Sequence, residues 1–227
     1  MRVIIAAILA GALTLAAAIP ATAAEEYADV WFGGETDDKR IALTFDDGPH
    51  PRYTAEILDI LAEYDIPATF FIVGDLARQY PALVLRELSE GHELGSHTWS
   101  HPHIRNVTEA ALREELAGTE ELLLELADYR PQLFRPPEGA CDDLVRRVAG
   151  VMDYDVVLWT VDTRDWSRPP AAEIVENVLA NTREGAIILC HDFVGGQSST
   201  PAALREFIPA LLAAGFEFVT VSELIGG

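Results

Sequence analysis

Short apolar runs alternate with longer helix-like stretches along most of this chain, and this alternation limits the folds it can adopt. Strand-like runs occupy residues 41–45, 68–73, 92–96, 132–134, 155–161, 186–191 and 216–221. The helix-like stretches between them lie near residues 52–64, 75–90, 108–128, 141–150, 171–183 and 201–214. Such alternation predicts an α/β architecture with parallel strands. It favours a barrel over an open sheet but does not by itself decide between them.

The first 24 residues have a different character from the rest. One Arg precedes an uncharged apolar stretch that ends at Ile19, and small residues follow up to Ala24. This order is typical of a secretory signal peptide with its cleavage site. An uncleaved membrane anchor is the alternative, although the apolar stretch is slightly shorter than the roughly 20 residues that a span needs. We therefore expect a signal peptide at 1–24, a short acidic N-terminal lead at 25–38 and one domain at 39–227. The mature protein is then secreted, without stable membrane insertion.

Acidic residues dominate the composition, with 37 Asp and Glu against 16 Lys and Arg and a net charge of −21. This balance argues against nucleic acid as a partner, because phosphate binding needs Lys and Arg. We expect a secreted monomer, which an acidic surface keeps soluble. Adaptation to high salt is a further hypothesis that the net charge suggests. The two cysteines, Cys141 and Cys190, either form one disulfide or remain two small buried apolar residues.

Polar side chains follow the ends of successive strand-like runs. They are Asp46 and Asp47 after the first run, His97 after the third, Arg135 after the fourth, Asp165 after the fifth and His191 after the sixth. In a β/α barrel the active site lies at the carboxyl ends of the strands. We therefore expect these residues to gather at one site.

A metal site is the first expectation for this edge. Asp47, His97 and His101 make a set of two imidazoles and one carboxylate, which leaves coordination positions open as catalytic zinc sites require. The two His residues share a face if their segment is helical. As its neighbour on the strand, Asp46 is expected to point to the opposite side from Asp47 and can do a different task. The other His residues, His50, His92 and His103, have no comparable neighbours, and we interpret them as surface or supporting residues.

Five segments resemble the motifs of one family, in that family's order. TFDDGP at 44–49 and SHTWSHP at 96–102 resemble the first two motifs of the polysaccharide deacetylases, also called the NodB homology domain or carbohydrate esterase family four. FRPPEG at 134–139, DTRDW at 162–166 and IILCHD at 187–192 match three more, so the resemblance spans about residues 39–221. It implies a distorted (β/α)7-type barrel and metal-dependent removal of acetyl groups from carbohydrate. Zn²⁺ is the expected cofactor, with Co²⁺ tolerated.

Chemical roles follow for the residues at the strand ends. A metal ion makes hydroxide available near neutral pH, and Asp46 can act as the general base beside it, held by a charge-assisted hydrogen bond from Arg135. His191 is the expected general acid for the leaving amine, and Asp165 would orient it and raise its pKa.

The remaining expected site residues form the substrate pocket. Trp166 and Leu189 look like walls for the acetyl methyl group. By resemblance, a backbone N–H from the turn at 137–139 stabilises the oxyanion. Glu138 stands in this turn where the family usually has an aromatic residue. Its charge at the rim of the cleft leads to the hypothesis that a cationic, partly deacetylated glucosamine polymer is favoured.

Three functions remain open at this point. The first is a deacetylase for an N-acetylglucosamine polymer, chitin-type or peptidoglycan. The second is an O-acetyl esterase acting on acetylated xylan, because the same residues would serve both reactions. The third is an inactive carbohydrate-binding protein on the same fold. Loss of Asp46 or of a metal ligand would have indicated this function, and none of these residues is lost.

Overall fold

The computed structural model describes residues 27–226, so the predicted signal peptide at 1–24 lies outside the described residues. Within that range nine strands form one sheet in the order β1-β6-β5-β4-β3-β2-β8-β7, with β9 beside the start of β2. The strands are β1 (Val30–Trp31), β2 (Arg40–Gly48), β3 (Thr69–Ile72), β4 (Glu93–Ser96), β5 (Leu133–Phe134), β6 (Asp155–Val157), β7 (Val161–Asp162), β8 (Ile187–His191) and β9 (Glu217–Val219). All of these strand pairings are parallel.

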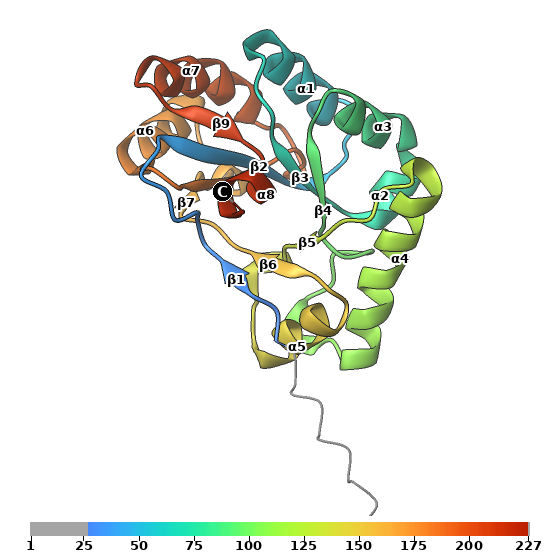
Figure 1. The fold of residues 1–227 in the computed structure, drawn as a ribbon. Helices are drawn as coiled ribbons and strands as arrows, with labels where there is room; N and C mark the ends of the chain where they lie inside the picture. Colours follow the sequence, from blue (N-terminus) through green and yellow to red (C-terminus); the bar gives the residue numbers. More distant parts are fainter. Residues whose placement is uncertain (1–26, 227) are drawn as a thin grey trace, which may run out of the picture.

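Helices flank this curved sheet, most of them on its outer side (Figure 1), whereas the last helix packs its Val221 and Leu224 against Ala42 and Phe71 on the inner side. The helices are α1 (Tyr53–Tyr64), α2 (Gly74–Gln79), α3 (Pro81–Ser89), α4 (Glu109–Ala127), α5 (Asp143–Val151), α6 (Ala171–Asn181), α7 (Thr200–Ala213) and α8 (Val221–Ile225). Three short 3₁₀ turns, η1 (Ile104–Asn106), η2 (Pro137–Gly139) and η3 (Asp165–Ser167), follow β4, β5 and β7. Because β1 and β7 end the sheet without pairing to each other, the curled sheet makes an open half-barrel. The expected α/β fold of the distorted (β/α)7 type is confirmed.

The core explains why the central strands read as continuous apolar runs. In β2 the side chains of Ile41, Leu43 and Phe45 are fully buried in the main cluster, together with residues of α1 and α7. A parallel strand covered on both faces has no solvent side and loses the alternation of an amphipathic strand. A second cluster lies between α4, α5 and β6. A third cluster, with Ala42 and Phe71 beside Val221 and Leu224 of α8, lies on the inner face of the sheet, so β2 is covered on both faces.

Most of the predicted elements are present, with three differences. The run at 155–161 is two strands, β6 and β7, and the helix at 75–90 is divided into α2 and α3, where Pro81 begins a new helix. The lead at 25–38 contains β1, whose Val30 and Trp31 pair with β6. A strand of two residues is too short to show a period of two in the sequence.

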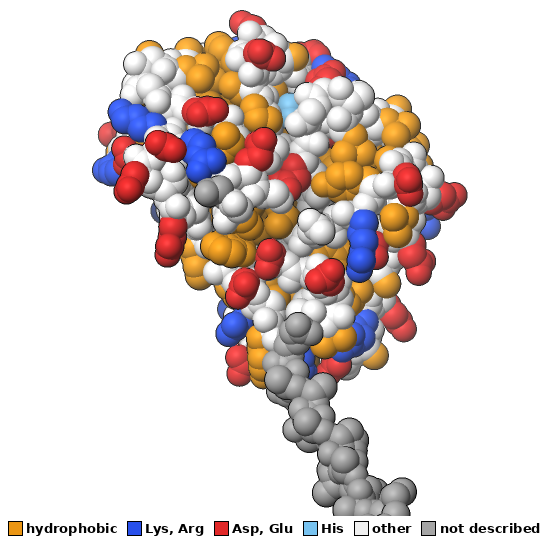
Figure 2. Space-filling view, viewed as in Figure 1, with side chains coloured by type: hydrophobic (Ala, Val, Ile, Leu, Met, Phe, Trp, Pro, Cys, Tyr) orange, Lys and Arg blue, Asp and Glu red, His pale blue; other side chains and the backbone are white. Residues whose placement is uncertain are grey.

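Both thiols are free: Cys190 is buried in β8 and Cys141 is half-buried before α5. No helix among residues 27–226 has the length and apolar character needed to span a membrane. Acidic side chains outnumber basic ones on the face drawn in Figure 2, as the composition predicts.

Candidate active site

The two adjacent aspartates owe their positions to an irregularity at the end of β2. Asp46 is in register with Phe71 and Gly48 with Ile72, so Asp47 is an extra residue between them, a β-bulge with φ of 74°. A regular strand would send the two carboxylates to opposite faces. The bulge instead lets both line one pocket.

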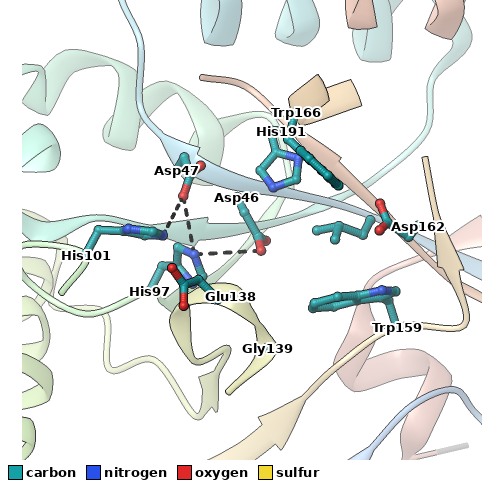
Figure 3. Close-up of a pocket in the computed structure, with 11 residues that line it drawn as sticks. Asp46, Asp47, His97, His101, Glu138, Gly139, Trp159, Asp162, Trp166 and His191 are labelled. Atoms are coloured by element: carbon teal, nitrogen blue, oxygen red, sulfur yellow. Dashed lines mark ion pairs between the residues drawn. The ribbon is translucent and has the colours of Figure 1, made fainter. Parts of the chain in front are cut away.

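Asp47, His97 and His101 come together as the sequence predicts, although the segment from His97 to His101 is a loop and not a helix. Thr98 and His101 have positive φ values of 71° and 53°, which turn the loop back on itself. The Asp47 Oδ1 lies 3.4 Å from the His97 Nε2 and 3.2 Å from the His101 Nε2 (Figure 3). One donor atom from each residue lies within 4.8 Å of the others, which is the arrangement of a metal site.

These three residues fit a divalent cation. The Asp47 Oδ1 is buried and has no hydrogen-bond partner among the described residues. The Nδ1 of His97 lies 2.6 Å from the Arg135 carbonyl oxygen, to which it can donate, and this leaves Nε2 as a ligand atom. Burial alone would raise the pKa of Asp47, but the His101 and His97 imidazoles lower it below its usual value. The carboxylate is therefore ionised and ready to bind a cation.

Glu115 of α4 holds this loop and was not predicted to matter. Its carboxylate accepts hydrogen bonds from the backbone N–H of Trp99 at 2.9 Å and of Ser100 at 2.8 Å. It also accepts one from the Ser100 hydroxyl at 2.8 Å. Glu115 therefore fixes the segment between His97 and His101.

Asp46 is almost completely buried and is paired with Arg135, as predicted. The Arg135 Nη1 donates to the Asp46 Oδ1 at 2.7 Å. Arg135 is fully buried, and its other donors reach the Thr44 hydroxyl and the carbonyl oxygens of Val157 and Leu158. Burial lowers the pKa of Arg135, whereas Asp46 raises it. The second Asp46 oxygen lies 3.8 Å from the His97 Nε2, beside the metal site.

His191 lies at the end of β8 and is bonded to Asp165. The His191 Nδ1 is 2.7 Å from the Asp165 Oδ1, and the other Asp165 oxygen accepts from the His191 N–H at 2.8 Å and the Thr200 hydroxyl at 2.7 Å. Burial would lower the pKa of His191, but the hydrogen bond and charge of Asp165, with Asp46 and Asp47, raise it to about 9. The imidazole is therefore protonated at neutral pH.

One pocket of about 490 Å³ connects these groups. Eight predicted site residues line it: Asp46, Asp47, His97, His101, Glu138, Trp166, Leu189 and His191. Arg135 and Asp165 lie behind the wall, where they contact Asp46 and His191. Gly139, Trp159 and Asp162 also line the pocket. Trp159 and Asp162 lie just after β6 and at the end of β7, so their place after strand ends was a signal that could have identified them.

The turn at η2 holds a backbone donor beside the pocket. Glu138 has a positive φ of 59°, and its side chain pairs with His103, the Nδ1 of which is 2.8 Å from the Glu138 Oε1. The N–H groups of Gly139 and Ala140 donate to Pro136 and Pro137, whereas no described hydrogen bond uses the N–H of Glu138. A Cβ on Gly139 would lie 2.7 Å from the Trp159 ring, so the turn needs glycine there. The Glu138 N–H is thus available to an oxyanion.

Comparisons with known proteins agree with this geometry. The sequence model of the polysaccharide deacetylase family matches residues 33–157. A peptidoglycan-N-acetylglucosamine deacetylase of Bacillus cereus is 41% identical over 191 residues, covering 83% of this chain and 89% of the relative. A chitooligosaccharide deacetylase of Rhizobium leguminosarum bv. trifolii is 40% identical over 202 residues, covering 83% and 93%.

Solved structures are similar as well. The Bc1960 peptidoglycan N-acetylglucosamine deacetylase, in complex with 4-naphthalen-1-yl-N-oxidanyl-benzamide, has a TM-score of 0.85 at 39% identity, covering 88% of this chain and 94% of that one. A family 4 acetyl xylan esterase from Clostridium thermocellum with a cobalt ion has a TM-score of 0.75 at 34% identity, covering 82% and 89%. On its sequence, its half-barrel and the residues of its pocket, this chain belongs to the polysaccharide deacetylase family.

Proposed function

We propose that this chain is a secreted, metal-dependent N-deacetylase that acts on an N-acetylglucosamine polymer, chitin-type or peptidoglycan. The observation that carries the proposal is the pocket that brings the Asp47, His97 and His101 set within reach of a buried carboxylate, Asp46, and a protonated imidazole, His191. Relatives named for peptidoglycan and for chitooligosaccharide deacetylation support it.

Asp47, His97 and His101 would hold the metal ion. A bound divalent cation supplies Lewis acidity, which polarises a carbonyl group and lowers the pKa of water. Two imidazoles and a carboxylate with open positions suit Zn²⁺. Cobalt in the Clostridium thermocellum relative supports Co²⁺ as an alternative.

The protein's own residues would then move two protons. Asp46, held by Arg135, accepts a proton from the attacking water, and the free Glu138 N–H donates to the oxyanion that forms on the acetyl carbonyl. His191 donates its proton to the nitrogen of the leaving amine. Because Asp165 holds the pKa of His191 at about 9, this imidazole carries the proton at neutral pH. Trp166 and Leu189 would enclose the acetyl methyl group.

Acetate release under matched conditions tests the proposal. Chitooligosaccharides, peptidoglycan fragments and acetylated xylan are each incubated with the protein, with and without a chelator, and with Zn²⁺ or Co²⁺ added back. We expect acetate from the N-acetylated glycans, loss of release with chelator and recovery with metal.

The same panel separates the alternatives. Release from acetylated xylan alone would favour an esterase, for which the likeness to the acetyl xylan esterase is the supporting observation. Binding to glycans without acetate from any substrate would favour an inactive carbohydrate-binding protein. Secretion is checked separately, by the N-terminal sequence of the mature protein, which we expect to begin at Glu25.

A further inference from the structure

Three arginines have no side-chain partner, in a protein where acidic groups are abundant. Among residues 27–226, the side chains of Arg105, Arg164 and Arg168 make no hydrogen bond, ion pair or ring contact. Several other exposed arginines pair with carboxylates, such as Arg205 with Glu63 and Arg130 with Glu120, whereas Arg52 contacts the Tyr53 ring and Arg183 donates to the Thr182 carbonyl oxygen. With a net charge of −21, an unpaired guanidinium is an exception that calls for a reason.

All three unpaired arginines belong to loops at the carboxyl edge of the sheet. Arg164 and Arg168 stand directly before and after η3, whose Trp166 lines the pocket and is 50% exposed. Arg105 lies in η1, four residues after the ligand His101. None of the three lines the pocket itself, but these free cationic groups of an otherwise acidic protein stand in loops that follow the same strand ends.

The backbone at Arg164 and Arg168 supports a functional interpretation. Their φ values are 58° and 59°, a left-handed conformation that residues other than glycine seldom adopt. Strained backbone of this kind concentrates at binding and catalytic sites.

The nearby carboxylates do not neutralise these arginines. The Asp162 Oδ1 accepts the backbone N–H of Arg164 at 2.8 Å, without an ion pair to its guanidinium, and Glu138 pairs with His103. Both guanidinium groups are therefore free to bind a negatively charged group from outside the chain.

We propose that Arg164 and Arg168 bind a carboxylate group carried by the glycan, on either side of a sugar packed against Trp166. Guanidinium groups bind carboxylates through paired, charge-assisted hydrogen bonds, and an exposed indole offers an apolar face to a sugar ring. The inference rests on the proposed function and assigns these arginines to substrate choice. It favours acid-substituted glycans, such as peptidoglycan strands with lactyl or peptide carboxylates, over neutral chitooligosaccharides.

The test compares substrates in one double variant, Arg164→Gln with Arg168→Gln. The kcat/KM for deacetylation is measured on chitooligosaccharides, on peptide-free peptidoglycan strands and on strands that carry stem peptides, all of matched length. We expect the ratio of acid-substituted to neutral kcat/KM to fall about tenfold, since two exposed charge-assisted contacts contribute a few-fold each. A fall already seen with peptide-free strands assigns the contact to the lactyl carboxylate, and a fall seen only with stem peptides assigns it to the peptide.

Matched variants keep the result interpretable. Arg130→Gln removes one positive charge just before β5, at the opposite edge of the sheet, and should leave the ratio as in the wild type. Replacing both Arg164 and Arg168 with Lys keeps the positive charges but not the paired donors, so the ratio should fall only about threefold. This variant also keeps two long cationic side chains at the surface, so we expect it to fold as the wild type does. An unchanged ratio in the Gln variant, or an equal change in Arg130→Gln, overturns the inference. Wild-type protein that releases acetate from none of these glycans would instead contradict the proposed function.

Discussion

Replacing Arg135 with Ala should strongly destabilise the protein, because it removes the partner of a buried carboxylate. Arg135 is fully buried, and its guanidinium donates to Asp46 at 2.7 Å, to Thr44 at 2.8 Å, to Val157 at 3.1 Å and to Leu158 at 3.0 Å. Breaking a buried ion pair on one side costs about 3–5 kcal/mol. In a domain of this size 1 kcal/mol corresponds to roughly 2–4 °C. We therefore expect Arg135→Ala to lower the melting temperature by about 6–20 °C.

Urea unfolding followed by tryptophan fluorescence measures this loss as a free energy of unfolding. The matched control is the double variant Arg135→Ala with Asp46→Leu, which removes both charges and so leaves no buried carboxylate without a partner. It should be more stable than Arg135→Ala alone, by roughly 1–3 kcal/mol. A loss of less than about 1 kcal/mol in Arg135→Ala would refute the reasoning, since an exposed pair would cost no more than that. A double variant whose loss of stability equals the sum of the losses in Arg135→Ala and in Asp46→Leu would refute it as well.

The remaining predictions concern metal, pH, substrate charge and salt. Asp46→Asn should keep the metal content measured by atomic emission and lose acetate release by about 10²–10⁴-fold, whereas His97→Ala should lose the metal; equal metal content in the two proteins contradicts their assigned roles. Because Asp165 raises the pKa of His191 to about 9, acetate release should fall as pH rises toward 9 and the imidazolium loses its proton. A bound cation repels the imidazolium and so moves this fall to somewhat lower pH. Asp165→Asn should move that basic limb to lower pH, and an unmoved limb would exclude His191 as the acid. Glu138→Tyr should reduce any preference for partly deacetylated over fully acetylated oligomers; an unchanged preference removes the hypothesis that the Glu138 charge selects cationic glycans. Thermal melting at increasing NaCl should show rising stability if the net charge of −21 reflects adaptation to high salt, and a flat series argues against it.

Local patterns predicted the secondary structure well where the elements were long. The apolar runs at 68–73 and 186–191 became β3 and β8, and the stretch near 108–128 became α4, which the Thr108 side chain caps by accepting the Ala111 N–H. The two-residue strand β1 was not predictable, because its only support is pairing with β6, more than 120 residues later in the chain.

The site was predictable to the level of residue type and order. Successive strand ends brought Asp46, Asp47, His97 and His191 to one pocket, as parallel strands require. The helical explanation for the His97 and His101 spacing was wrong, since a loop with two positive φ values places them. Glu115, which holds that loop, gave no sequence signal, because an acidic residue on a helix is most often a solvated one.

By itself, then, the sequence determined the α/β class and the family and predicted a metal-ligand set, because these depend on periodicity and on motifs that are continuous in the chain. Only the tertiary structure decided how the residues work together. The bulge at Asp47, the burial of Arg135 against Asp46 and the pairing of Glu138 with His103 depend on partners far away in sequence. That Arg164 and Arg168 lack a partner also depends on which side chains the fold places near them. Charge, burial and hydrogen bonding are properties of such surroundings, and chain order alone does not contain them.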